Sequence, residues 1–267
     1  MLKRGRLLRF IRALSPGILA IGSGCWTTVQ AQVLETETAR LPARGSWEVG
    51  GNYEYQKSSD GRESAFPWAI QYGLRDTWEL LVEPVATTAI RSAGASRVSG
   101  SGDLEITLTH LFRKDSGSRW PALAWAAEVK VPTGKKPLIG TGEYDYTGYL
   151  IASKRFGKFD LHANLSYTMI GNPPGANLED VFGVAVGTVY RPNPNYEVFG
   201  EVLATSASGG GEQNTSAGAI VPEAAGGETV VTVGAGRFFR SNLLGFISIG
   251  TDNNAAHQAR VGFTISF

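Results

Sequence analysis

The chain has 267 residues, of which 42% are hydrophobic and 10% aromatic, so it can bury enough apolar surface to fold and is not a disordered chain. Its 25 lysines and arginines almost balance its 24 aspartates and glutamates, which excludes a nucleic-acid-binding protein, because such proteins need clustered basic residues in excess of acids. The length allows one large all-β domain or two small domains, and the 34 glycines favour strands joined by turns.

Residues 1–31 have the pattern of a secretory signal peptide. The basic residues at its start are Lys3, Arg4, Arg6, Arg9 and Arg12, and no acid accompanies them. An apolar stretch follows over residues 13–24, which is too short to span a bilayer as a helix. Val29 and Ala31 are the small residues expected before a cleavage site. We therefore predict that residues 1–31 are removed during secretion.

The remaining chain carries 20 basic and 24 acidic residues and no cysteine, because Cys25 is the only cysteine of the sequence. A lipoprotein signal at Cys25 is disfavoured, since Gly22 stands where a bulky aliphatic residue is expected. A secreted chain without disulfides needs a large hydrogen-bonded structure for its stability. No apolar run approaches the roughly 20 residues of a membrane helix.

Apolar and polar residues alternate along the rest of the chain in segments of about ten residues or more, a pattern typical of transmembrane β-strands. Residues 47–56 (WEVGGNYEYQ) and 258–267 (QARVGFTISF) are clear examples. The alternation predicts twelve strands, at about 46–56, 64–76, 77–90, 101–115, 119–134, 144–157, 158–171, 181–193, 196–208, 228–240, 243–253 and 256–267.

The connections between these segments alternate between long and short. Short turns fall at 75–77, 157–158 and 240–242, and the longest connection spans residues 206–227. An even number of antiparallel strands, with short periplasmic turns and long extracellular loops, is the layout of an outer-membrane barrel. We therefore predict an all-β fold, a closed antiparallel transmembrane β-barrel over residues 46–267, preceded by a periplasmic N-terminal segment over residues 32–45.

A soluble barrel or sandwich would show the same alternation with its apolar face inward. Three features argue against that alternative: the strands are long for a soluble sheet, aromatic residues gather near strand ends, and the polar face mixes carboxylates with small residues. The chain also ends on an in-phase apolar series. Phe263, Ile265 and Phe267 resemble the C-terminal signal that the bacterial barrel assembly machinery reads.

The sequence GDLEITLTHLF (102–112), a short polar turn and then WPALAWAAEVKVPTG (120–134) resemble the outer-membrane protein family named for the meta-pathway of phenol degradation. The segment FDLHANLSY (159–167) and the C-terminal strands fit that family too, so the resemblance covers most of residues 46–267. It implies a transporter or channel for small compounds, often hydrophobic or aromatic, and it implies no catalytic residues.

The polar phase of the strands predicts the residues that line the lumen. Acids outnumber bases in this set, which predicts a weakly cation-selective passage, because a charge ring of one sign concentrates its counter-ions. The candidates for the lumen and its selectivity are Glu79, Glu83, Asp103, Glu105, Glu128, Lys130, Asp160, His162, Glu197, Glu201 and Arg260. The 206–227 loop is the candidate constriction.

Three functions remain open from the sequence: a diffusion channel for small solutes, a lateral route for hydrophobic or aromatic compounds, and a structural or adhesive barrel that acts through its extracellular loops. An outer-membrane hydrolase is less favoured, because no serine, histidine and acid are arranged as such an enzyme needs. His162 is interpreted as a pore-lining residue and His110 as an interfacial residue. The expected protein is therefore not an enzyme.

The expected location is the bacterial outer membrane, reached through a cleaved signal peptide. The expected partners are outer-membrane lipid and lipopolysaccharide, the barrel assembly machinery and a small-molecule solute, with no nucleic acid. The sequence predicts no cofactor and no metal site.

Overall fold

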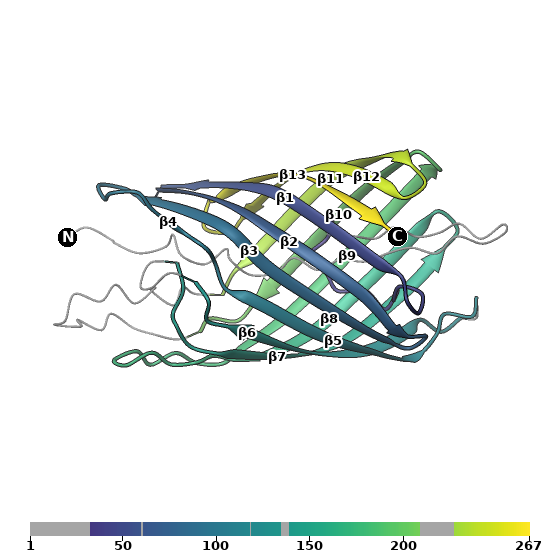
Figure 1. Cartoon of the computed structure of the whole chain (residues 1–267), viewed down its shortest axis with the longest axis horizontal. Coiled ribbons are helices and arrows are strands. Elements are labelled where there is room, and N and C mark those ends of the chain that lie inside the picture. Colours follow the sequence, from purple (N-terminus) through teal and green to yellow (C-terminus); the bar gives the residue numbers. More distant parts are fainter. Residues whose placement is uncertain (1–32, 60, 118, 135–138, 209–226) are drawn as a thin grey trace.

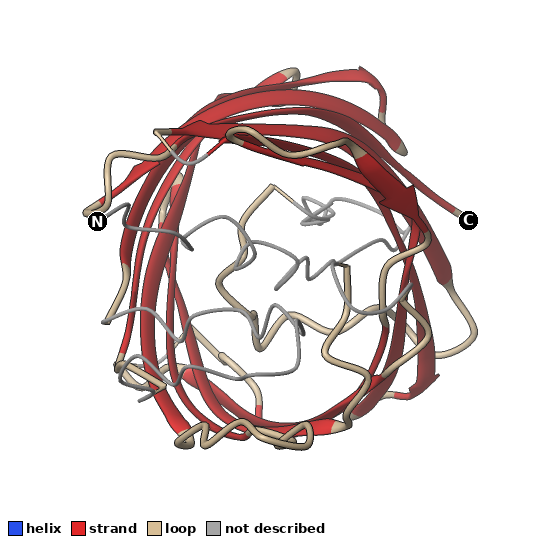
Figure 2. Cartoon of the chain, turned by 90° about the vertical axis from the view of Figure 1, so that its left-hand side faces the viewer, coloured by secondary structure: helices blue, strands red, loops and turns tan. Residues whose placement is uncertain are grey.

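The structure, a computed structural model, describes residues 33–267 with the exception of residues 60, 118, 135–138 and 209–226. Over this part the chain forms one antiparallel β-sheet that closes on itself (Figure 1). Viewed along its axis, the strands form a complete ring (Figure 2). Within the described ranges there is no helix long and apolar enough to cross a membrane.

Twelve of the strands in the described part form the wall of the barrel, and each pairs with its neighbours in the chain. The exception is the short β4, which pairs only with the far end of β3. The strands are β1 (Trp47–Ser58), β2 (Gly61–Arg75), β3 (Trp78–Ser92), β4 (Val98–Gly100), β5 (Leu104–Arg113), β6 (Ala122–Val131), β7 (Asp145–Phe156), β8 (Phe159–Met169), β9 (Val181–Asn193), β10 (Tyr196–Thr205), β11 (Thr229–Arg240), β12 (Leu243–Asp252) and β13 (His257–Ser266).

The barrel closes where β1 pairs with β13 along ten residues, from Glu48 opposite Ser266 to Lys57 opposite His257. The Phe267 amide donates a hydrogen bond of 2.9 Å to the carbonyl of Trp47, and the Trp47 amide donates back to the Phe267 carbonyl. Inside the barrel the Ser266 hydroxyl donates to the Glu48 carboxylate at 2.6 Å. The last residue of the chain therefore takes part in the seam.

The two faces of each strand differ as the alternation predicts. On β8, Leu161 and Leu165 are 40% and 47% exposed, whereas His162 and Asn164 between them are 1% and 5% exposed. The outer surface thus carries bands of exposed apolar side chains on successive strands, for which lipid is the fitting solvent. The predicted fold class is confirmed, and the soluble alternative, which needs an apolar interior, is wrong.

Most strand boundaries agree with the alternation to within a few residues, and three details differ. The sequence did not predict β4. It placed a long loop after the first strand, but β1 and β2 pair up to Ser58 opposite Gly61. Arg75 follows the polar phase of the segment 64–76, which predicts an inward side chain, but a register shift at the end of β2 leaves this residue exposed at the turn.

The largest difference concerns the segment before β1. Residues 32–45 were expected in the periplasm, yet Val33, Leu34, Thr36 and Ala39 are buried against inward-facing side chains of the barrel. The segment leaves the lumen beside β2. An added Cβ on Gly73 would lie 2.1 Å from the Ala43 carbonyl oxygen, so only glycine fits at that position. We call residues 33–45 the lumenal segment.

Replacing Phe267 with Asp should prevent assembly, because it places a charge at the lipid-facing end of the closing strand. The expected result is loss of the heat-dependent shift in gel mobility that folded barrels show, with unfolded protein in the periplasm. Phe112→Asp, at an aromatic position that is also exposed (55% against 70% for Phe267) on a strand that does not form the seam, serves as the control. A Phe267→Asp protein that shifts on heating like the parent, at equal abundance, would contradict the assignment of the assembly signal.

Candidate functional site

The lumen is the candidate site, and the lumenal segment occupies part of it. Glu201 on β10 accepts three hydrogen bonds from the segment through one carboxylate oxygen, from the amides of Glu35 and Thr36 at 2.8 and 2.9 Å and from the Thr36 hydroxyl at 2.9 Å. Asn164 on β8 pairs with Glu37 in both directions, accepting from its amide at 2.6 Å and donating to its carbonyl at 2.8 Å. These bonds replace the strand partners that an extended segment otherwise needs.

Further along, the Ala39 amide donates to the Ser153 hydroxyl oxygen on β7 at 2.8 Å. Ser153 and His162 share a second hydrogen bond of 2.8 Å, and because Ser153 already accepts from Ala39, its proton is free to be donated to the ring nitrogen. His162 was predicted to line the pore. The structure places it on the inward phase, directly opposite Ser153 in the ladder and 1% exposed, and its role in a pore stays a prediction.

Arg40 fastens the segment near the periplasmic end. Its guanidinium donates to Asp160 at 2.8 Å and to Asp115 at 3.3 Å. Asp115, in the turn between β5 and β6, also accepts from Lys154 at 2.7 Å. Burial alone would raise the pKa of Asp115, but the hydrogen bonds from Lys154, Arg155, Gly117 and Arg40 outweigh it and hold that pKa well below its ordinary value. This anchor therefore stays charged at any physiological pH.

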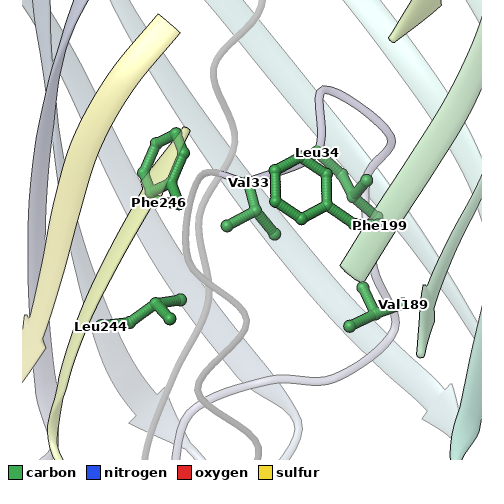
Figure 3. Close-up of a cluster of buried hydrophobic side chains, with 6 residues drawn as sticks. All are labelled: Val33, Leu34, Val189, Phe199, Leu244 and Phe246. Carbon is green, nitrogen blue, oxygen red and sulfur yellow. The ribbon is translucent and has the colours of Figure 1, made fainter. Parts of the chain in front are cut away.

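Apolar contacts support the same docking. Val33 and Leu34 pack on an inward-facing patch made by residues of β9, β10 and β12 (Figure 3). We call this patch, formed by Val189, Phe199, Leu244 and Phe246, the lumenal apolar patch. Farther along the segment, Ala39 and Leu41 pack on small inward side chains of β6 and on Ile151. The segment is thus held by both polar and apolar contacts, and no covalent bond fixes it there.

The opposite end of the segment meets the charged residue Arg260 on β13. Arg260 donates to Glu35 at 3.0 Å, to Glu201 at 3.4 Å and to the Ser248 hydroxyl at 3.1 Å. Its side chain is fully buried. Because two carboxylates bind this guanidinium, they neutralise the positive charge of Arg260, and no free positive charge remains there to attract an anion.

Four carboxylates on the wall formed by β3, β5 and β6 gather with Glu37 of the lumenal segment. Glu83 lies directly opposite Glu105 in the ladder and faces the charges of the other members. Glu128 accepts from the Tyr149 hydroxyl at 3.0 Å and from Thr107 at 3.4 Å. We call these residues, Glu37, Glu79, Glu83, Glu105 and Glu128, the acidic cluster. Among the residues that the structure describes, no group of His, Cys, Asp and Glu is arranged to hold a metal ion.

The remaining predicted residues lie elsewhere along the lumen. Lys130 bridges Asp145 at 2.7 Å and Asp103 at 3.8 Å near the extracellular end. Glu197 pairs with Arg191 at 2.9 Å. The predicted set therefore divides into residues that hold the segment, residues paired to each other, and the acidic cluster. Their role in selectivity stays a prediction.

Sequence reasoning missed several residues of the site. Asn164, Ser153 and Thr36 are uncharged, and Asp115 lies in a turn, so none stood out in the alternation. The predicted constriction at 206–227 falls largely outside the described residues. A different loop does reach the mouth: Ile139, from the β6–β7 connection, is buried against Ile90 of β3.

Comparison with solved structures finds similar barrels. The chain resembles the COG4313 outer membrane channel from Pseudomonas putida F1, with a TM-score of 0.65 and 16% identity over 85% of this chain and 97% of that one. It also resembles the KdgM porin in complex with disordered oligogalacturonate, with a TM-score of 0.54 and 11% identity over 82% of this chain and 99% of that one. At these identities the likeness shows the fold alone. No family model and no curated protein matches the sequence, so the resemblance to the phenol meta-pathway family stays a prediction.

Substituting both Asn164 and Ser153 with Ala should loosen the lumenal segment, because three hydrogen bonds to its backbone are lost at about 1 kcal/mol each. A cysteine introduced at Ala39 reports the change, since the chain without residues 1–31 has no other cysteine. Thiol labelling should become at least about tenfold faster. The control is Thr147→Val with Thr168→Val, a buried pair whose hydroxyls bond to each other. Equal labelling rates in all three proteins would show that these bonds do not hold the segment.

Proposed function

We propose that the protein is an outer-membrane channel for the passive passage of small solutes. The observation that carries the proposal is a closed barrel whose lumen is lined by charged and amide side chains, only some of which the lumenal segment engages. A structural barrel would gain stability from an apolar interior or from one in which acids pair with bases, since carboxylates crowded together in a dry interior are costly. The acidic cluster is better suited to a hydrated passage that favours cations.

A second candidate solute class has its own supporting observation. The lumenal apolar patch offers Phe199 and Phe246, whose ring centroids lie 6.4 Å apart, and its present occupants are Val33 and Leu34. If the segment withdraws, the patch presents an aromatic and aliphatic surface inside the barrel. This supports passage of hydrophobic or aromatic compounds, as the family resemblance implies. Uptake of aromatic substrates by a deletion strain, complemented with the parent or with Phe199→Asn, tests this class.

The non-conducting alternative is a structural or adhesive barrel that acts through its loops. Reconstitution into planar bilayers separates the two. A channel gives discrete single-channel currents, whereas an adhesive barrel gives none with any ion. A catalytic role has no support from the site, and we propose that the protein is not an enzyme.

We expect a small, weakly cation-selective conductance whose selectivity falls as salt rises and the Debye length shrinks from about 10 Å at 0.1 M. Glu79→Gln combined with Glu83→Gln should shift the reversal potential toward zero without affecting assembly, because the amide keeps the side-chain volume. The matched control is Glu143→Gln, which removes one charge from the β6–β7 loop outside the acidic cluster. An anion-selective reversal potential in the parent protein would overturn the predicted selectivity, and silence in every solute would overturn the channel itself.

A further inference from the structure

Four polar residues and one glycine form a row across five neighbouring strands, close to the mouth that carries the long loops. Each member lies directly opposite the next in the ladder: Thr232 of β11 faces Gly250 of β12, Gly250 faces Gln258 of β13, Gln258 faces Gln56 of β1, and Gln56 faces Glu63 of β2. We call these five residues the polar row. The lumenal segment does not account for the polar residues of this row, because it docks on other inward-facing residues.

Every side chain of the polar row has a buried oxygen atom with no hydrogen-bond partner in the described part of the chain: Thr232 Oγ1, Gln258 Oε1, Gln56 Oε1 and Glu63 Oε2. The residues are 1%, 7%, 8% and 5% exposed, respectively. A buried polar atom without a partner costs about 1–3 kcal/mol, and native proteins contain few of them. Four such acceptors side by side therefore need partners that the described part of the chain does not supply, and water or a bound solute can provide them.

Gly250 lets the acceptors of the row lie close to one another. A Cβ at this position would lie 3.0 Å from Thr232 Oγ1, 3.3 Å from the Val231 carbonyl oxygen and 3.6 Å from Gln258 Oε1. Gly250 is not among the residues with positive φ, so the backbone does not require glycine here. Any side chain at this position would instead crowd two of the unpartnered acceptors.

The chemistry of the row selects the kind of ligand. All four free atoms are acceptors, so a ligand must donate hydrogen bonds. The two carboxamides and the hydroxyl can also donate, which suits ligand groups that both donate and accept better than an ammonium, which only donates. The row contains no base, and Arg260, two residues along β13 from Gln258, is already engaged by Glu35 and Glu201, so the row offers no free positive charge to an anion.

We propose that the polar row is a binding subsite for a neutral solute with several hydroxyl groups, such as a short saccharide, at the entrance of the lumen. Neighbouring strands are about 4.8 Å apart, so the row spans roughly 19 Å, the scale of a trisaccharide. The inference rests on the proposed channel function, since it assigns that channel a solute class. Weak binding near the mouth raises the local solute concentration and still allows release.

The test uses the full barrel purified in an amine-oxide detergent, which has no sugar headgroup. Saturation-transfer NMR measures binding of maltotriose, and a polyethylene glycol of similar mass is the comparison solute, because its ether oxygens accept but do not donate. We expect binding of maltotriose alone. Gly250→Ala should weaken it by at least about tenfold, since the methyl group would crowd Thr232 Oγ1 and Gln258 Oε1, two of the acceptors that face the solute. Gly148→Ala is the matched control, because an added Cβ there meets nothing within 4 Å.

Gln56→Leu provides a second variant that removes one acceptor at similar volume, in case Gly250→Ala assembles poorly. Equal binding in the parent and in the assembled row variants, or no binding by the parent, would overturn the inference. Planar-bilayer currents on the same proteins test the channel separately. Currents without maltotriose binding would refute the subsite and leave the channel standing, whereas binding without currents would support the subsite and refute the channel.

Discussion

The hydrogen bonds that join β1 to β13 are the constraint on which the rest of the structure depends. Lipid offers no partner to a backbone amide or carbonyl, so strands can span a membrane only in a sheet without edges. Closure fixes the face of every side chain, because the two faces alternate at each residue. The apolar series that ends on Phe267 must therefore point to lipid, and the phase that contains Glu48 must point inward. A polar interior is thus the consequence of closing this sequence into a ring.

The polar side chains of the interior need water, an ion-pair or hydrogen-bond partner, or a covering segment, and they are satisfied in more than one of these ways in this barrel. On β7, β8 and β10 the lumenal segment supplies backbone amides to Ser153, Asn164 and Glu201, so the inward groups of these strands are satisfied by the chain itself. On β13 the segment reaches Arg260 through Glu35, but closer to the mouth it makes no bond to the unpartnered acceptors of the polar row on β11, β13, β1 and β2. The described part of the lumen therefore has one region that holds the segment and a second, the polar row, that we propose as a solute subsite.

The period of two was enough to predict the barrel, because strand, face and closure all follow from it. For β9 the expected range of 181–193 coincides with Val181–Asn193. The inward phase likewise identified Glu201, Asp160 and Arg260 as lumenal. The alternation could not identify the partners of these lumenal residues. The Glu37–Asn164 bonds join residues 127 positions apart, and the lumenal segment has no alternation of its own. Bulges also break the rule locally: the register shift near Arg75 moves that residue off the inner face. The alternation therefore predicts whether a side chain points inward or outward. It does not predict which segment lies inside the lumen, because that depends on contacts between residues far apart in the sequence.

Arg260 marks the boundary between the two regions of the lumen. It lies two residues along β13 from Gln258 of the polar row, and it binds both Glu35 of the lumenal segment and Glu201 of the wall behind it. A free guanidinium at this point would attract anions into the barrel, but two carboxylates and the Ser248 hydroxyl engage it. The row itself therefore offers hydrogen-bonding groups and no free positive charge. In the channel that we propose, a solute that enters past the polar row would meet hydrogen-bond acceptors first and, deeper along the barrel, either the acidic cluster or the lumenal apolar patch. Such a lumen would admit neutral solutes according to the hydroxyl groups they can donate, because Arg260, engaged by two carboxylates, offers no free positive charge to an anion.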